Sequence, residues 1–311
     1  MENTVDKKSL FRAAKKDYMI IFAYLIAMII GSSVLQLIAG VVFGAIGIAE
    51  KPYAQYLLIL IPLHLITMPV AYFLLRVKRD TEIEKKSISP LLFLGIIPII
   101  YAGVYAGNSI SNIITSLIND QSQQAVANLT ASADSDFFRI LVVGISAPIV
   151  EEILFRKLII DRLAKYSQIW AVIISSVSFG IFHMNFAQLF YATIIGFILG
   201  YVYIKTGKLI YTIALHMVVN LATSAIAANL LKLNSDTPIV IYSAVLLILA
   251  VLGVVLFIVK YRKFMKLKKN ENITSGQAAK LCLLNPVSII YFVIGFGSIA
   301  FTTIAMIAMA S

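Results

Sequence analysis

Long apolar runs alternate with short polar segments along most of the 311 residues. Each run is long enough to cross the ~30 Å hydrocarbon core of a bilayer as an α-helix. The pattern predicts an all-α fold, a polytopic membrane helical bundle of about eight to nine transmembrane helices. Nine spans are expected, at 18–48, 56–75, 90–118, 137–160, 168–186, 187–204, 209–230, 238–259 and 283–310.

Composition and charge agree with a membrane protein. Apolar residues make up 60% of the chain and charged residues 13%, outside the range of soluble domains. The net charge of +11 alone would suit a nucleic-acid partner, but the basic residues gather between the spans, so we expect none. With the N-terminus in the cytoplasm, all Lys and Arg except Lys51, Arg139 and Lys232 lie on the inner side. We therefore predict an integral membrane protein, in the plasma membrane if the source is bacterial.

Two features near the ends of the chain narrow the picture further. The single cysteine, Cys282, excludes an intrachain disulfide and a multi-cysteine metal cage. The basic N-terminal segment precedes a long apolar run without a recognisable cleavage site, so we interpret that run as a retained first span.

The fourth apolar run contains two carboxylates and a guanidinium, Glu151, Glu152 and Arg156. An ionisable residue near the bilayer centre costs ~2.5–3.5 kcal/mol, so these charges need partners or water. On a helix, Glu152 and Arg156 are i,i+4 neighbours and are expected to pair, whereas Glu151 points about 100° away. Pro148 lacks an N–H, which leaves the carbonyl of Gly144 without its helical donor and predicts a kink beside a polar cavity.

Two of the three histidines follow in nearby spans. Phe179 and His183 lie four residues apart in the fifth span, so the ring of Phe179 can shelter His183. His216 and Asn220 have the same spacing in the seventh span and can point at one target. The third histidine, His64, is expected to be a hydrogen-bonded structural residue.

These groups suit hydrolysis. A carboxylate shielded from water is a stronger base and can take a proton from a water molecule, and Glu151 is the candidate. A neighbouring histidine can orient that water, while His216 and the amide of Asn220 can donate to the oxyanion of a tetrahedral intermediate. No serine or cysteine nucleophile with an adjacent base is evident, which disfavours an acyl-enzyme.

Taken in order, the motifs resemble those of the CAAX prenyl protease and bacteriocin-processing family, also called CPBP or Abi. They are Pro148-x-x-Glu151-Glu152-x-x-x-Arg156, Phe179-x-x-x-His183 and Thr206-Gly207-x-Leu209, followed by His216-x-x-x-Asn220. The resemblance covers about 137–230 and divides the chain into N-terminal helices (1–136), a protease core of four catalytic spans (137–230) and C-terminal helices (231–311).

The resemblance implies an intramembrane endopeptidase whose active site is open to the cytosolic side. Its substrate would be a membrane-associated or lipidated peptide or protein, with peptide maturation or bacteriocin self-immunity as expected roles in a bacterium, and membrane lipid would surround it. By resemblance, Glu151 and His183 would activate water, His216 and Asn220 would stabilise the oxyanion, and Glu152, Arg156 and Phe179 would support the site.

A metal is left open at this point. Glu151, His183 and His216 could supply the ligands of a catalytic Zn²⁺ with one open position. The chain has no His-Glu-x-x-His motif, however, and these ligands come from three separate spans. We therefore expect no obligatory cofactor and keep a zinc-dependent protease as the alternative.

Two other function classes use buried ionisable residues. A transporter or proton pathway does so, but here the polar residues gather in one part of the chain without an inverted repeat. An inactive relative that serves as a scaffold is the third alternative. The catalytic hypothesis predicts that Glu151, His183, His216 and Asn220 converge in one polar cavity. Straight helices place His183 at a different depth, so a kink at Pro148, helix tilt or a turn at 184–188 is needed.

Overall fold

The computed structural model describes residues 7–75, 83–118, 136–233, 235–264, 266–268 and 273–310. All regular elements in these ranges are helical, which confirms the all-α class. Parts of two basic loops that decide the predicted orientation, 76–82 and 269–272, lie outside the described residues.

Several helical segments follow one another without a break and form longer rods. The label η marks a π-helical segment. In chain order they are α1 (Lys7–Ala45), α2 (Ala54–Ile59), η1 (Leu60–Thr67), α3 (Met68–Leu75), α4 (Pro90–Leu117), α6 (Asp136–Arg139), η3 (Ile140–Ser146), α7 (Ala147–Glu152), η4 (Ile153–Ile160), α8 (Asp161–Leu163), α9 (Gln168–Ile181), α10 (Phe186–Thr206), α11 (Leu209–Leu221), η5 (Ala222–Ala227), α12 (Ala228–Leu230), α13 (Thr237–Leu256), η6 (Phe257–Tyr261), α14 (Ser275–Leu283) and α15 (Pro286–Ala310).

Each of the nine apolar runs corresponds to one helical rod, but not all nine qualify as clear membrane spans. Within the described residues, seven helices are long and apolar enough to cross a membrane. The continuous rod from α6 to α8 carries several charged residues, and α9 has only 14 residues, about 21 Å. The expected count of nine is thus corrected to seven clear candidates and two sheltered helices. The short helix α14 was not predicted, although Thr274 and Gln277 form a capping box at its start.

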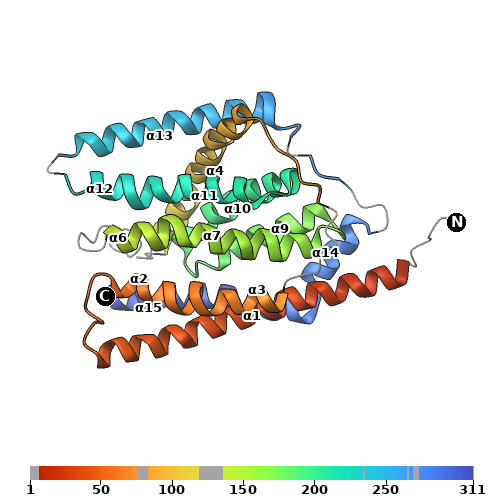
Figure 1. The fold of residues 1–311 in the computed structure, drawn as a ribbon, viewed down its shortest axis with the longest axis horizontal. Helices are drawn as coiled ribbons and strands as arrows, with labels where there is room; N and C mark the ends of the chain where they lie inside the picture. Colours follow the sequence, from red (N-terminus) through yellow and green to blue (C-terminus); the bar gives the residue numbers. More distant parts are fainter. Residues whose placement is uncertain are drawn as a thin grey trace.

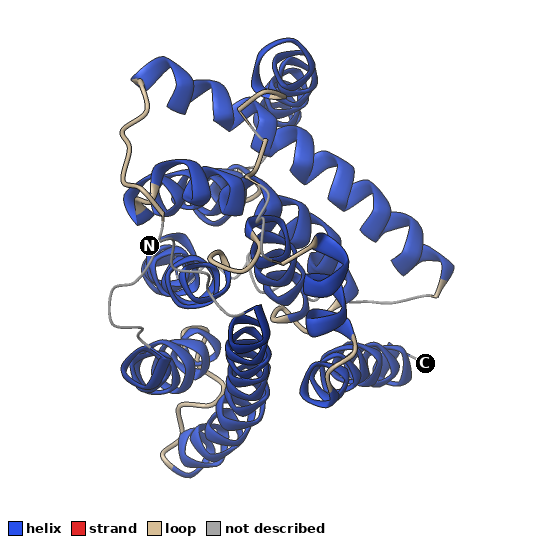
Figure 2. Cartoon of the chain, turned by 90° about the vertical axis from the view of Figure 1, so that its right-hand side faces the viewer, coloured by secondary structure: helices blue, strands red, loops and turns tan. Residues whose placement is uncertain are grey.

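The two sheltered helices lie in the middle of the bundle. Figure 1 shows α1 and α15 along one edge and α13 along the opposite edge, with α7, α9, α10 and α11 between them. Figure 2 looks along the bundle and shows most helices end-on. The largest cluster of buried apolar side chains includes Leu154 and Phe155 of η4 and Phe179 of α9. This packing removes the polar helix from lipid without requiring that the helix itself be apolar.

Close helix contacts occur where small residues leave room for them. A Cβ on Gly107 of α4 would lie 2.2 Å from Cα of Tyr191 on α10, so only glycine allows this approach. Gly196 packs in the same way against Ser176 of α9. Gly40 and Gly44 lie four residues apart in α1. In contrast to Gly107, a Cβ built on either would meet no atom of another described helix within 4 Å.

Charged residues tie the helices together at the two ends of the bundle. At one end, Asp17 of α1 accepts hydrogen bonds from Arg162 at 3.3 Å and from Tyr166 at 2.7 Å. Within the described residues, helix α1 extends from Lys7 and so includes residues before the apolar run at 18. At the other end, Asp136 pairs with Arg139 and Lys232. Arg162 and Lys232 thus lie on opposite ends, as the predicted topology requires.

Candidate active site

The carboxylates lie on a helix that is π-helical on both sides of them. Segment η3 precedes α7 and η4 follows it. The N–H of Ala147, next to Pro148, donates to the carbonyl of Val142 five residues earlier. The backbone therefore accommodates Pro148, which has no N–H, by forming a wider helical turn. A Cβ on Gly144 would lie 2.7 Å from a methyl of Leu221, so α11 packs directly against this stretch. The backbone irregularity predicted at Pro148 therefore takes the form of a π-helical segment.

Glu152 and Arg156 form the pair expected from their spacing. The Arg156 Nε atom lies 2.9 Å from Glu152 Oε2, and both side chains are fully buried. The Arg156 Nη1 atom also donates to Ser175 Oγ at 3.1 Å, and the Ser175 hydroxyl donates to the Phe155 carbonyl at 2.7 Å. The guanidinium lies over the Phe179 ring, 5.2 Å from its centroid. Arg156 therefore holds helices α7, η4 and α9 together at one point.

His216 lies between the two carboxylates. Its Nδ1 is 3.1 Å from Glu152 Oε1, and its Nε2 is 3.7 Å from Glu151 Oε2. Because an ionised carboxylate only accepts hydrogen bonds, Nδ1 carries a proton directed at Glu152. Nε2 is then the ring nitrogen that faces Glu151, at a separation longer than a direct hydrogen bond.

Glu151 and Glu152 differ in their access to solvent. The Glu151 side chain is 12% exposed, whereas the Glu152 side chain is completely buried. Glu152 is also tied to Arg156 and His216. Of the two, only Glu151 has surface left to meet a water molecule.

His183 is positioned by the turn that joins α9 to α10. Its Nδ1 lies 2.9 Å from the Phe179 carbonyl, which can only accept, so a neutral His183 has its free lone pair on Nε2. Met184 has a left-handed backbone with φ of 54°, and Asn185 bonds to the His183 carbonyl at 2.6 Å while it caps α10. The turn spans 182–185, close to the turn expected at 184–188. It brings His183 within electrostatic range of Glu151.

The Phe179 ring separates the two histidines and orients both. It makes edge-to-face contacts with His183, at 5.1 Å between ring centroids, and with His216, at 5.5 Å. The sequence predicted the contact with His183 from the spacing, but not the contact with His216.

Asn220 differs from the expected arrangement. Its side-chain amide nitrogen donates to the Val143 carbonyl at 2.8 Å, within the π-helical segment η3. One of its two amide hydrogens is therefore used to fix that segment. His216 lies beside Glu151, and His183 contacts the same Phe179 ring as His216, while Asn220 lies one helical turn beyond His216 and is tied to the helix that carries the carboxylates.

Sequence reasoning missed two residues near the site. Ser175 anchors Arg156, and its position four residues before Phe179 on the same face of α9 was the available signal. Ser146 lies 2.8 Å from Nδ1 of His64 and so links η3 to η1. His64 is thus hydrogen-bonded, as expected of a structural residue, but its partner belongs to another helix.

The donor set was also compared with the needs of a metal. Among the described residues, no group of three His, Cys, Asp or Glu side chains is arranged to hold a metal ion. Nδ1 of His216 and Nδ1 of His183 are directed at Glu152 and at a backbone carbonyl. Metal-binding histidines hold their other ring nitrogen in the same way, so a zinc-dependent reaction stays an alternative for which Glu151 and the Nε2 atoms of His183 and His216 would supply the ligands.

A known protein family matches the central part of the chain. Residues 133–222 match the family model described as type II CAAX prenyl endopeptidase Rce1-like. This segment is therefore similar to the Rce1-like family. The match includes every predicted site residue from Glu151 to Asn220, which confirms the resemblance seen in the motifs.

One curated relative supports the same assignment. The "Putative membrane peptidase YdiL" of Bacillus subtilis (strain 168) is 39% identical over 82 residues, which is 26% of this chain and 34% of the relative. The matched part therefore spans about a third of that relative's length. No solved structure matches the chain. The Rce1-like segment is thus the part of the molecule to which functional proposals apply.

Proposed function

We propose that this protein is an intramembrane endopeptidase that hydrolyses a peptide bond in a membrane-associated or lipidated peptide or protein. One observation carries the proposal: His216 lies between a partly exposed Glu151 and a fully buried Glu152 that is paired with Arg156. A base that water can reach and a fixed proton carrier are the groups that amide hydrolysis needs. The match of residues 133–222 to the Rce1-like family model supports the same reaction class.

In the proposed reaction, Glu151 takes a proton from water while the water oxygen attacks the carbonyl carbon of the substrate. The Nε2 lone pair of His183 accepts the second hydrogen bond of that water and fixes its direction. Glu151 then passes the proton to the amide nitrogen as the carbon–nitrogen bond breaks. The products are a carboxylic acid and an amine, and Glu151 regains its charge.

The negative charge on the tetrahedral intermediate needs hydrogen-bond donors. A protonated Nε2 of His216 is the first candidate, because Glu152 holds the ring by its other nitrogen. The free amide hydrogen of Asn220 is the second. Removal of one such donor typically lowers the reaction rate by ~10²–10³-fold. Glu152 and Arg156 touch no reacting atom and act by positioning His216.

We also propose an orientation with the N-terminus in the cytoplasm and the site accessible from that side. The basic clusters around Arg162 and Lys205 gather at one end of the bundle, as expected for an inner face. In a bacterium, peptide maturation or bacteriocin self-immunity would be suitable roles.

The decisive experiment compares peptides released from membranes that contain the wild type, Glu151→Gln or His216→Ala. We expect release to fall by ~10²–10⁴ for Glu151→Gln, the usual range for loss of a general base. Glu84→Gln is the matched control, because Glu84 is exposed and, among the described residues, forms an ion pair with Lys86 alone. Equal release from wild type and both site variants would leave a transporter or scaffold role instead.

The zinc-dependent alternative has its own test. We expect purified protein to retain cleavage after treatment with a chelator, because the reaction proposed above uses only side chains of the chain. Complete loss of activity that is fully restored by added Zn²⁺ would establish the metal-dependent reaction.

A further inference from the structure

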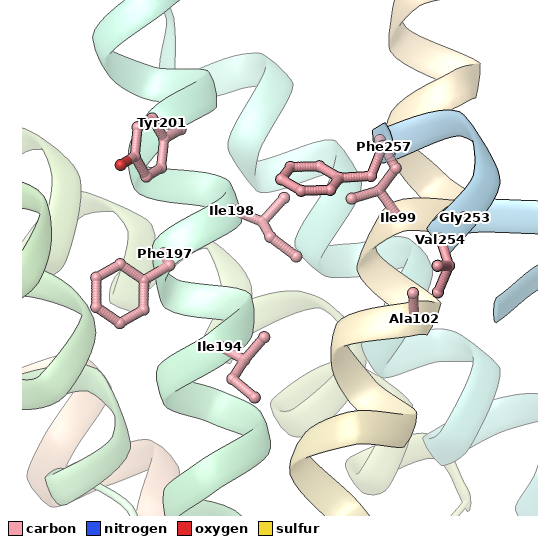
Figure 3. Close-up of a pocket in the computed structure, with 9 residues that line it drawn as sticks. All are labelled: Ile99, Ala102, Ile194, Phe197, Ile198, Tyr201, Gly253, Val254 and Phe257. Atoms are coloured by element: carbon pink, nitrogen blue, oxygen red, sulfur yellow. The ribbon is translucent and has the colours of Figure 1, made fainter. Parts of the chain in front are cut away.

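An apolar groove lies away from the candidate active site, between α10, α4 and α13. It encloses about 380 Å³ and opens on the surface of the bundle, where Val254 is 51% and Phe257 38% exposed. A cavity of this size falls within the range of ligand sites, ~300–1,000 Å³. Figure 3 shows the Phe257 ring reaching across the groove toward Ile198, with Ala102 of α4 on the same side as Val254.

The groove is a fixed part of the fold and not a gap between loosely packed helices. Helix α4 packs along both α10 and α13 and forms its floor. At Gly103, a Cβ would lie 2.9 Å from Ile194, and at Gly253 it would lie 2.0 Å from the Pro98 carbonyl. The two glycines therefore set how closely the walls approach the floor.

Positive charge lies at one end of this groove. The lining residue Tyr201 is followed four residues later on α10 by Lys205, and the lining residue Phe257 is followed three residues later by Lys260. Residues four apart share a face of an α-helix, so Lys205 continues the α10 wall toward the end of the bundle. Lys260 follows Phe257 in the π-helical segment that ends this wall of the groove. The groove is therefore apolar along its length and positively charged at one end.

Among the residues that the structure describes, three lysines at this end have no carboxylate partner. Lys205 lies within electrostatic range of two like charges, Lys268 and Lys86. In the described part of the chain, no ion pair joins Lys205, Lys260 or Lys268 to a carboxylate, whereas Lys86 pairs with Glu84 at 2.7 Å. An anion placed there would relieve the repulsion between these charges.

We propose that this groove binds an anionic phospholipid. One acyl chain lies between α10 and α13 against α4, and the phosphate lies between Lys205 and Lys260. The charge pattern selects the head group, because a lysine near an anionic lipid head group strengthens binding about fivefold. The proposal does not depend on the peptidase reaction, and no cleavage enters its test.

The test measures the unfolding temperature of the purified full-length chain in non-ionic detergent as lipid is added. We expect phosphatidylglycerol to raise it at lower concentration than phosphatidylcholine with the same acyl chains. The double variant Lys205→Gln/Lys260→Gln should need an about 25-fold higher concentration of phosphatidylglycerol for the same rise in unfolding temperature, because each lysine contributes about fivefold. Lys15→Gln/Lys16→Gln on α1 is the matched control, with the same loss of charge on exposed residues elsewhere, and should bind as the wild type does.

A bulky side chain placed in the groove tests whether the groove binds an acyl chain. Ala102→Phe should reduce the phosphatidylglycerol effect, and Val254→Phe, at a more exposed lining position, serves if the first variant folds poorly. Equal effects of the two lipids on the wild type would overturn the proposal. So would an equal loss in the α1 control, unchanged binding in a folded groove variant, or the full effect from inorganic phosphate alone.

Discussion

The ion pairs of the candidate site and those around Asp17 both join helices of this bundle, and they differ in their surroundings. In the candidate site, Glu152 and Arg156 are both fully buried. At the end of the bundle, Asp17 is 18% exposed and meets Arg162, which is 13% exposed, and Lys165, which is 31% exposed. Both groups join separate helices, but only the first has no contact with water.

The difference shows how burial changes the contribution of an ion pair to the free energy of unfolding. A buried ion pair gains little overall, because desolvation opposes the attraction, yet removal of one partner is costly. A pair near the surface is screened, and each contact is worth little. The candidate site is therefore expected to be intolerant of single changes, whereas the Asp17 cluster should tolerate them.

The largest effect is expected from Arg156→Met. Glu152 would remain as a buried charge without its partner, at a cost of ~3–5 kcal/mol in the free energy of unfolding. His216 would also lose its fixed acceptor, so cleavage should be lost with the fold intact. Equilibrium unfolding in mixed micelles and peptide release from membranes measure the two effects.

The double variant Glu152→Gln/Arg156→Met is the control for this prediction. It removes both charges, so it should recover much of the stability lost in the single variant but none of the cleavage. A double variant as unstable as Arg156→Met would mean that packing, and not the buried charge, dominates at this position.

An intermediate effect is expected from Ser175→Ala. The change removes the Ser175 acceptor of the buried Arg156 Nη1 donor and the hydroxyl bond to the Phe155 carbonyl, so we expect a loss of ~1–3 kcal/mol in unfolding free energy. Ser176→Ala is the matched control, because the Ser176 hydroxyl bonds only to the Val172 carbonyl of its own helix, at 2.6 Å. If the two variants unfold alike, Ser175 does not anchor Arg156.

The smallest effect is expected from Arg162→Gln. Asp17 keeps Lys165 and Tyr166 as partners, so the unfolding free energy should fall by only ~0.2–1 kcal/mol. The difference from wild type should shrink further in high salt, because these groups are screened. A loss as large as that of Arg156→Met would remove the distinction between the two regions.

Local features of the site could be predicted because they depend on helical geometry alone. The Glu152–Arg156 pair and the Phe179–His183 contact both follow from a spacing of four residues. The irregular backbone at Pro148 follows from its missing N–H, although the π-helical form that it takes does not. The number of clear spans was overestimated, because apolar length cannot show which helices other helices shelter.

Contacts between helices could not be predicted. His216 meets Glu152 from a position 64 residues later, and Asn220 bonds to the Val143 carbonyl from 77 residues away. Which face a helix turns toward its neighbour depends on its rotation and tilt, which small residues such as Gly107 and Gly144 set by allowing close approach. For this reason Ser175 and the tie between Asn220 and η3 were not anticipated.

The sequence by itself determined that the chain is a helical membrane protein with carboxylate, guanidinium and imidazole groups at fixed spacings inside apolar helices. Only the tertiary structure decided that Glu152 is sealed by Arg156 and His216 while Glu151 keeps some exposure. The two glutamates are adjacent in the chain, so their different surroundings arise from the helices packed on either side. A one-dimensional pattern does not contain that information, because it depends on the rotation of each helix about its axis.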